Sequence, residues 1–179
     1  AGIVTLKISE IFPNPPGDHL EGEFIELYNF GDDSVEMSGW AIADARKRYE
    51  IAAEDFGDSE LSPYAYFVLY RETTGISLNN TGEEEVRLFD GNGNLVDKIV
   101  FDASDYGEQS YALQTGSAWH WTATSTPGKE NIILNIEKEE TKAPRTEAPA
   151  PAEKVKETAE IKQAALSEVR GLPLGTIIQ

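Results

Sequence analysis

Residues 85–101 read EVRLFDGNGNLVDKIVF, and this stretch has the pattern of a β-hairpin. Val86 and Leu88 alternate with Glu85 and Arg87, which gives a strand one apolar and one polar face. The segment 90–94 consists of Asp, Gly and Asn, which tolerate the positive φ angles of tight hairpin turns. An apolar, β-branched run follows at Leu95–Phe101. The stretch therefore predicts two antiparallel strands joined by a short turn.

Short strand-like runs separated by turn residues continue on both sides of this hairpin, a pattern typical of an all-β sandwich or barrel. No helical periodicity of useful length occurs before residue 150. The proline-rich segment Pro13–Asp18 cannot continue a strand and is expected to be a loop. The predicted strands are residues 3–8, 23–30, 35–44, 48–51, 65–70, 85–90, 95–101, 110–112 and 118–121.

The aromatic residues indicate where the folded domain ends. All seven Phe, seven Tyr and three Trp lie between Phe12 and Trp121. Because aromatic side chains supply much of the apolar area that a core buries, we expect one compact domain over residues 1–131. Residues 132–168 are rich in Pro, Ala, Glu and Lys and are expected to form a linker, with a helix over 152–169 favoured by its composition. Residues 169–179 suit the first strand of a further domain, expected to continue after residue 179.

The charge is strongly acidic and unevenly placed. The formal net charge is −17, and residues 1–131 carry 24 Asp and Glu against 8 Lys and Arg. Nucleic-acid affinity comes mainly from Lys and Arg that neutralise phosphates, so the domain is not expected to bind nucleic acid. The one basic cluster, Arg46–Lys47–Arg48, is interpreted as a solvated strand edge or loop, with an anion site as the alternative. No apolar run approaches the roughly 18 residues that span a membrane.

The sequence lacks the residue patterns of common enzymes. It has no cysteine, which excludes disulfides and thiolate chemistry, and only two histidines, His19 and His120. No nucleophile elbow, zinc-protease motif or phosphate-binding glycine loop occurs. His120 lies between Trp119 and Trp121 and is expected on an edge strand. His19 lies in an acidic loop, where we expect it either to be solvated or to join a metal site. The domain is therefore expected to be non-catalytic and without a cofactor.

Calcium is the alternative to a domain without metal. Asp90, Asn92, Asn94 and Asp97 offer alternating oxygen side chains, as calcium loops do. A hairpin turn explains the same residues, and no terminal Glu follows at calcium-loop spacing. Two further acidic groups could serve in the same way: Asp55, Asp58 and Glu60, and Asp102 with Asp105.

Two acids stand on faces that otherwise look apolar. Glu26 shares a strand face with Phe24 and Tyr28, and Asp97 shares one with Ile99 and Phe101. A buried carboxylate must find hydrogen-bond donors, so we expect both to accept bonds from backbone N–H groups of neighbouring loops. Trp40 is expected in the centre of the core.

Several aromatic residues could form either a binding face for sugar or peptide or part of the core. They are Trp119, Trp121, Tyr64, Tyr66 and Tyr70, of which the three tyrosines share parity along one predicted strand. The sequence leaves both readings open, because exposure decides between them.

Four segments, taken together, resemble the lamin-tail domain of prokaryotic proteins. They are 8–15, 23–40, 61–70 and 86–97, closed by Ser125–Gly128 and Asn131. Pro63–Tyr64 stands where the family usually has Pro-Gly. The motif positions are Glu23, Glu26, Asn29, Gly39, Trp40, Asp97, Pro127 and Gly128.

The resemblance implies an all-β, immunoglobulin-like β-sandwich that acts as a non-catalytic binding or adaptor domain. It implies a larger protein, exported or attached to a prokaryotic cell surface, in which the domain contacts a protein or a cell-surface component. Two alternatives stay open: an accessory domain of an exported metal-dependent nuclease or phosphoesterase, and a structural spacer. Beside such domains, family members carry oligonucleotide-binding folds, whose first strand residues 169–179 would suit.

Overall fold

The computed structural model of this chain describes residues 4–52, 55, 60–114 and 117–134. These residues belong to one compact unit, residues 1–138. The linker beyond residue 134, the helix expected over 152–169 and the strand expected over 169–179 lie outside the described residues, so they stay predictions. Within the described part, no helix is long and apolar enough to cross a membrane.

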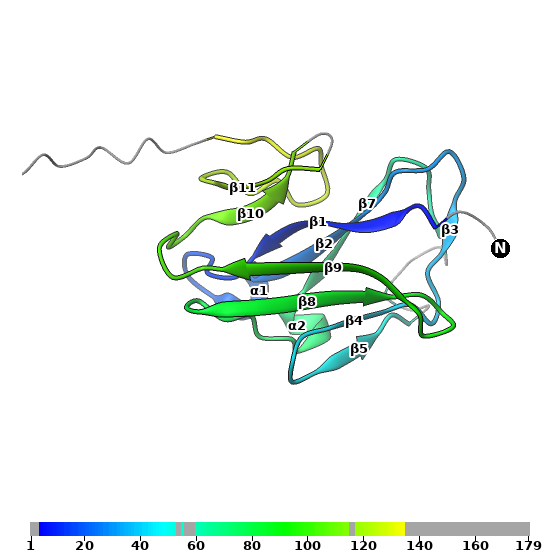
Figure 1. The fold of residues 1–179 in the computed structure, drawn as a ribbon, viewed down its shortest axis with the longest axis horizontal. Coiled ribbons are helices and arrows are strands. Elements are labelled where there is room, and N and C mark those ends of the chain that lie inside the picture. The colour runs from blue at the N-terminus through cyan, green and yellow to red at the C-terminus, as the bar shows by residue number, and fades with distance from the viewer. Residues whose placement is uncertain (1–3, 53–54, 56–59, 115–116, 135–179) are drawn as a thin grey trace, which may run out of the picture. The chain divides into compact units, whose positions relative to one another are not determined.

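Two antiparallel sheets face each other in an immunoglobulin-like β-sandwich (Figure 1). The large sheet has the order β11-β10-β1-β2-β7, with β1 Leu6–Phe12, β2 Phe24–Asn29, β7 Tyr66–Tyr70, β10 Ser110–Leu113 and β11 Trp119–Thr122. The small sheet has the order β5-β4-β8-β9, with β4 Ala41–Ala43, β5 Arg48–Glu50, β8 Glu83–Phe89 and β9 Leu95–Asp102. A two-stranded ribbon joins β3 Val35–Glu36 to β6 Glu60–Leu61, and α1 His19–Gly22 and α2 Arg71–Thr74 are single helical turns. The predicted fold class is confirmed.

The core lies between the facing sides of the two sheets. Ile8 and Leu27 from the large sheet and Leu88 from the small sheet are fully buried there. Trp40, only 8% exposed, belongs to the same cluster, as its aromatic bulk predicts. Along β8, Glu84, Val86 and Leu88 are buried and alternate with more exposed residues, so the alternation read from the sequence follows from the two-layer packing.

The predicted hairpin is β8–β9, paired from Glu83↔Asp102 to Phe89↔Leu95. The register shifts between Leu88 and Phe89, so that Asp97 stands opposite the buried Leu88. From there the Asp97 Oδ2 atom accepts a hydrogen bond of 2.9 Å from the Ile8 amide in the other sheet. The donor therefore belongs to a strand, whereas the sequence predicts a donor in a loop. This bond satisfies a β1 amide and links the two sheets.

Two predicted strands differ from the structure, and three short elements were not predicted. The first strand runs from 6 to 12 and not from 3 to 8, because a bulge between Ile8 and Glu10 breaks the alternation that marks a strand. The predicted strand 35–44 is two strands, since Gly39 adopts φ +79 and turns the chain. The helical turns α1 and α2 and the short strand β6 were not predicted, because elements of two to four residues have no measurable period.

Tyr64 is the one non-glycine residue of the described part with a positive φ, at 57°. It occupies the place where the lamin-tail pattern usually has glycine. Its side chain is 56% exposed, and its hydroxyl donates a hydrogen bond to Asp32. A side chain in this left-handed region costs conformational energy that glycine does not incur.

We therefore expect Tyr64→Gly to be more stable than Tyr64→Ala by about 0.5–1 kcal/mol in urea denaturation. Both substitutions remove the hydroxyl that contacts Asp32, so their difference isolates the backbone conformation. An alanine variant as stable as the glycine variant would show that the positive φ costs nothing here.

Candidate functional site

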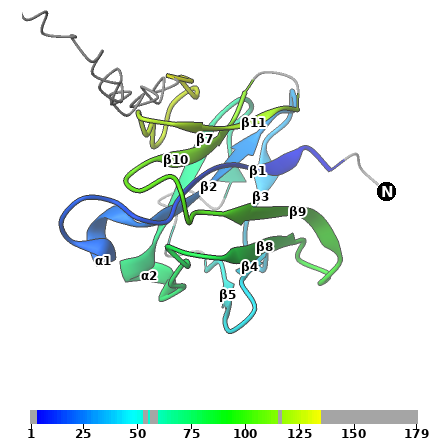
Figure 2. The same ribbon diagram turned by 60° about the vertical axis from the view of Figure 1, so that its left-hand side comes forward.

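The inner face of the β10–β11 hairpin carries a cluster of half-exposed aromatic rings. This hairpin forms one edge of the large sheet (Figures 1 and 2). Trp121 stacks on Tyr106 with ring centroids 4.4 Å apart and planes 10° apart. Tyr111 lies 4.9 Å from Trp121 and 5.1 Å from Trp119. Phe101 of β9 contacts Trp121 at 6.3 Å and joins the cluster to the core.

Three carboxylates stand beside these rings around an open hollow of about 400 Å³. Glu83 and Asp102 are cross-strand partners at one end of β8 and β9, and Asp105 lies in the loop that follows. Hydrogen bonds from Ser104 lower the pKa of Asp102, so it is ionised at neutral pH. We call this the aromatic hollow; its lining is Glu83, Val100, Phe101, Asp102, Asp105, Tyr106, Tyr111 and Trp121. Rings and carboxylates together attract cationic groups.

The structure joins only part of the predicted aromatic face. Trp119 and Trp121 come together, whereas the three tyrosines do not join them. Tyr64 lies in the turn before β7 and so does not share a strand face with Tyr66 and Tyr70, which corrects the prediction. Tyr66 stacks on Tyr28 at 4.5 Å, and Tyr70 packs edge-on against Phe24 at 5.9 Å. Sequence reasoning missed Tyr106 and Tyr111, whose only signal was their nearness to the tryptophans in the sequence.

On the outer face of the large sheet, two buried carboxyl groups lie side by side. Glu10 and Glu26 are cross-strand partners and each is 0% exposed. The segment 123–134, which we call the strap, covers them. The Gly128 amide donates to Glu26 Oε2 at 2.7 Å, and the Thr126 amide donates to Glu10 Oε2 at 3.1 Å. Ser9 donates to Glu26 at 2.7 Å, and Ser110 donates to Glu10 at 2.5 Å.

Other motif residues hold loops in place. The Asn29 amide donates to the carbonyls of Asp33, Leu61 and Ser62 at 2.8, 3.1 and 3.0 Å. Glu23 is 1% exposed and accepts hydrogen bonds from Arg71 and from the Leu78 amide. Gly39 lies against Gly91: a Cβ atom added to Gly39 would lie 3.7 Å from the Gly91 Cα atom. These contacts stabilise the fold and do not present reactive groups.

The family model described as Lamin Tail Domain matches residues 1–103. The chain belongs to the lamin tail domain family. No curated protein matches it. The lamin tail domain is a non-enzymatic, immunoglobulin-like domain, which agrees with the structural roles of Glu23, Glu26 and Asn29. The match ends before Asp105 and Tyr106, so the aromatic hollow combines residues of the matched region with residues that follow it.

Among the calcium candidates of this lamin tail domain, Asp90 and Asp97 are engaged at different places. Asp90 accepts hydrogen bonds from the amides of Asn92 and Asn94 and from the Asn94 side chain, at 2.8 to 2.9 Å, which lower its pKa. Asp97 points into the sandwich, toward Ile8. Within the described ranges, no three His, Cys, Asp or Glu side chains are grouped so that they could hold a metal ion.

Of the remaining candidates, Asp102 and Asp105 both line the aromatic hollow, whereas the others lie at separate places. Asp55 binds the Tyr49 hydroxyl and the Ala52 amide, and Asp58 lies outside the described residues. Glu60 pairs with Glu36 in the β3–β6 ribbon. His19 Nδ1 lies 3.8 Å from Glu23, and His120 is half-buried on the edge strand β11.

Burial raises the pKa of Glu26 to about 8. Hydrogen bonds from Ser9 and Gly128 lower this pKa in part, and a smaller repulsion from Glu10 raises it. The pKa of Glu10 is raised by burial as well. A group whose pKa is higher in the folded state stabilises the fold below its unfolded pKa. That contribution is lost as the pH rises through the folded pKa.

The free energy of unfolding should therefore fall by a few kcal/mol between pH 5 and pH 8. Glu26→Gln mimics the protonated carboxyl, so this variant should reduce that fall and be more stable than the parent at pH 8. Urea denaturation followed by tryptophan fluorescence at both pH values measures this. Glu72→Gln, an exposed position on α2, is the control and should keep the parent's slope. A parent whose stability rises toward pH 8 would contradict the assignment.

Proposed function

We propose that this lamin tail domain is an adaptor that docks a basic segment of a partner protein in the aromatic hollow. The observation that carries the proposal is the Tyr106–Trp121 stack beside the carboxylates of Glu83, Asp102 and Asp105. No Lys or Arg belongs to the lining that the described residues form. A Lys or Arg side chain would therefore meet both ring faces and negative charge.

The charge of the domain supports a cationic ligand over an anionic one. With a net charge of −17, the chain repels phosphate-rich polymers and attracts basic segments over a distance set by the ionic strength. Half-exposed aromatic residues are typical of binding surfaces, where they supply contact area at low entropic cost. The exported or surface-associated setting of the whole protein is part of the proposal and comes from the family resemblance.

The three tryptophans offer a direct test by NMR of their indole N–H signals. The probe is the peptide acetyl-Ser-Gly-Lys-Gly-Ser-amide, and its control carries Glu in place of Lys. We expect the Lys peptide to shift the signal of Trp121, and to a smaller extent that of Trp119, while the buried Trp40 is unchanged. Equal shifts with both peptides, or none, would refute the proposal.

The matched variants are Asp105→Asn, in the aromatic hollow, and Asp33→Asn, an exposed acid at another place. Both remove one negative charge, so a general charge effect would weaken binding equally. We expect Asp105→Asn to raise the dissociation constant about 3-fold, equivalent to about 0.6 kcal/mol, and Asp33→Asn to leave it nearly unchanged.

A further inference from the structure

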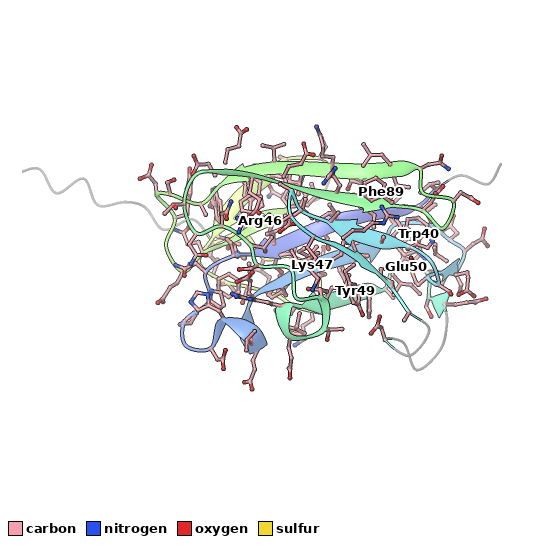
Figure 3. All side chains as sticks on the ribbon, turned by 90° about the horizontal axis from the view of Figure 1, so that it is seen from below. Trp40, Arg46, Lys47, Tyr49, Glu50 and Phe89 are labelled. Atoms are coloured by element: carbon pink, nitrogen blue, oxygen red, sulfur yellow. The ribbon has the colours of Figure 1, made fainter. Side chains whose placement is uncertain are left out.

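The outer face of the small sheet carries a second hollow with the opposite charge. The β4–β5 hairpin and the end of β8 form it, and Figure 3 labels Arg46, Lys47 and Phe89 among its residues. It measures about 260 Å³. We call it the basic hollow; its lining is Ala43, Asp44, Ala45, Arg46, Lys47, Arg48, Arg87 and Phe89.

Arg48 is the residue of this hollow best placed to take a ligand. Its guanidinium lies 4.4 Å from the centre of the Phe89 ring, and the Arg87 guanidinium lies 5.8 Å from the same ring. Arg87 also binds the Asp44 carbonyl at 2.5 Å and Glu85 at 3.4 Å. The ring contact is the one interaction of the Arg48 guanidinium within the described part of the chain. An arginine that a ring holds, and whose N–H donors meet no other described residue, is suited to a carboxylate.

The two hollows are connected along the sheet. A middle hollow of about 270 Å³ shares Glu83 and Val100 with the aromatic hollow and shares Ala45 and Arg46 with the basic hollow. On β8, Glu83 and Arg87 are four residues apart and face the same side. At about 3.4 Å per residue their separation is about 14 Å, the length of four residues of extended peptide.

We infer that this face binds one extended peptide segment with a cationic side chain in the aromatic hollow and a carboxylate side chain in the basic hollow. The inference rests on the proposed function and adds a second contact with a fixed spacing. The charge order, acidic at Glu83 and basic where Arg87 and Arg48 meet the Phe89 ring, matches a segment that carries Lys or Arg four residues from Asp or Glu. In this inference the basic cluster Arg46–Lys47–Arg48, interpreted from the sequence as a solvated edge, binds the carboxylate of the peptide.

The test compares three probes by the same indole signals: acetyl-Ser-Lys-Gly-Ser-Gly-Glu-Ser-amide, its Glu→Gln counterpart, and a peptide with Lys and Glu adjacent. We expect the first probe to bind 3- to 10-fold more tightly than the other two. Arg48→Gln should abolish that gain and leave binding of the Gln peptide unchanged. Lys129→Gln, which removes one exposed positive charge on the strap, should preserve the gain.

The outcomes separate the two proposals. The second contact is refuted if the Lys peptides bind but Glu does not increase their affinity, or if the increase in affinity persists in Arg48→Gln. Binding of a cationic side chain in the aromatic hollow is supported in both cases. If no Lys peptide shifts Trp121, the proposed function fails. A Glu-only peptide then tests the basic hollow alone, by the backbone amide signals of Arg48 and Phe89. Shifts that disappear in Arg48→Gln would support the carboxylate contact, and their absence would refute it.

Discussion

The structure depends on two carboxyl groups, Glu10 and Glu26, that are buried side by side beneath the strap. Such groups are costly to remove from water unless donors surround them. Most of their donors come from far along the chain, since Thr126 is 116 residues from Glu10 and Gly128 is 102 residues from Glu26. Asn131 extends the connection by donating to the carbonyls of Ser9 and Leu113 at 2.8 and 3.0 Å. The strap thus fixes the β10–β11 hairpin against β1.

The same hairpin presents the aromatic hollow on its other face. Along β10, Ser110 and Ala112 face the strap and are buried, whereas Tyr111 and Leu113 point the opposite way and are half-exposed. Hydrogen bonds on the strap side of the sheet hold β10 in place, and β10 positions Tyr111 on the opposite side. The hydrogen bonds of Glu10 and Glu26 therefore stabilise the strands that carry the aromatic hollow.

Parts of this architecture followed from local sequence. Alternation of Val86 and Leu88 with charged residues, together with the Gly and Asn residues of the turn, predicted the β8–β9 hairpin because those signals depend on neighbouring residues alone. The burial of Trp40 and the hydrogen bonding of Glu26 followed from the cost of exposing a large ring or leaving a carboxylate without donors. Glu10 was missed because the bulge at Ile8 breaks the alternation that would have placed it on a buried face.

By itself, the sequence determined the fold class, the family resemblance and the acidic charge, since periodicity, turn chemistry and composition are properties of short segments. Tertiary structure alone decided which aromatic residues meet. Tyr106 contacts Trp121 because the loop after β9 folds back onto β11. Tyr64 does not share a strand face with Tyr66 and Tyr70, because β7 begins at Tyr66. It also set Arg48 and Arg87 against one ring and joined the acidic and basic hollows through a middle hollow that shares lining residues with each. Such contacts depend on strand register and order, which no local pattern encodes.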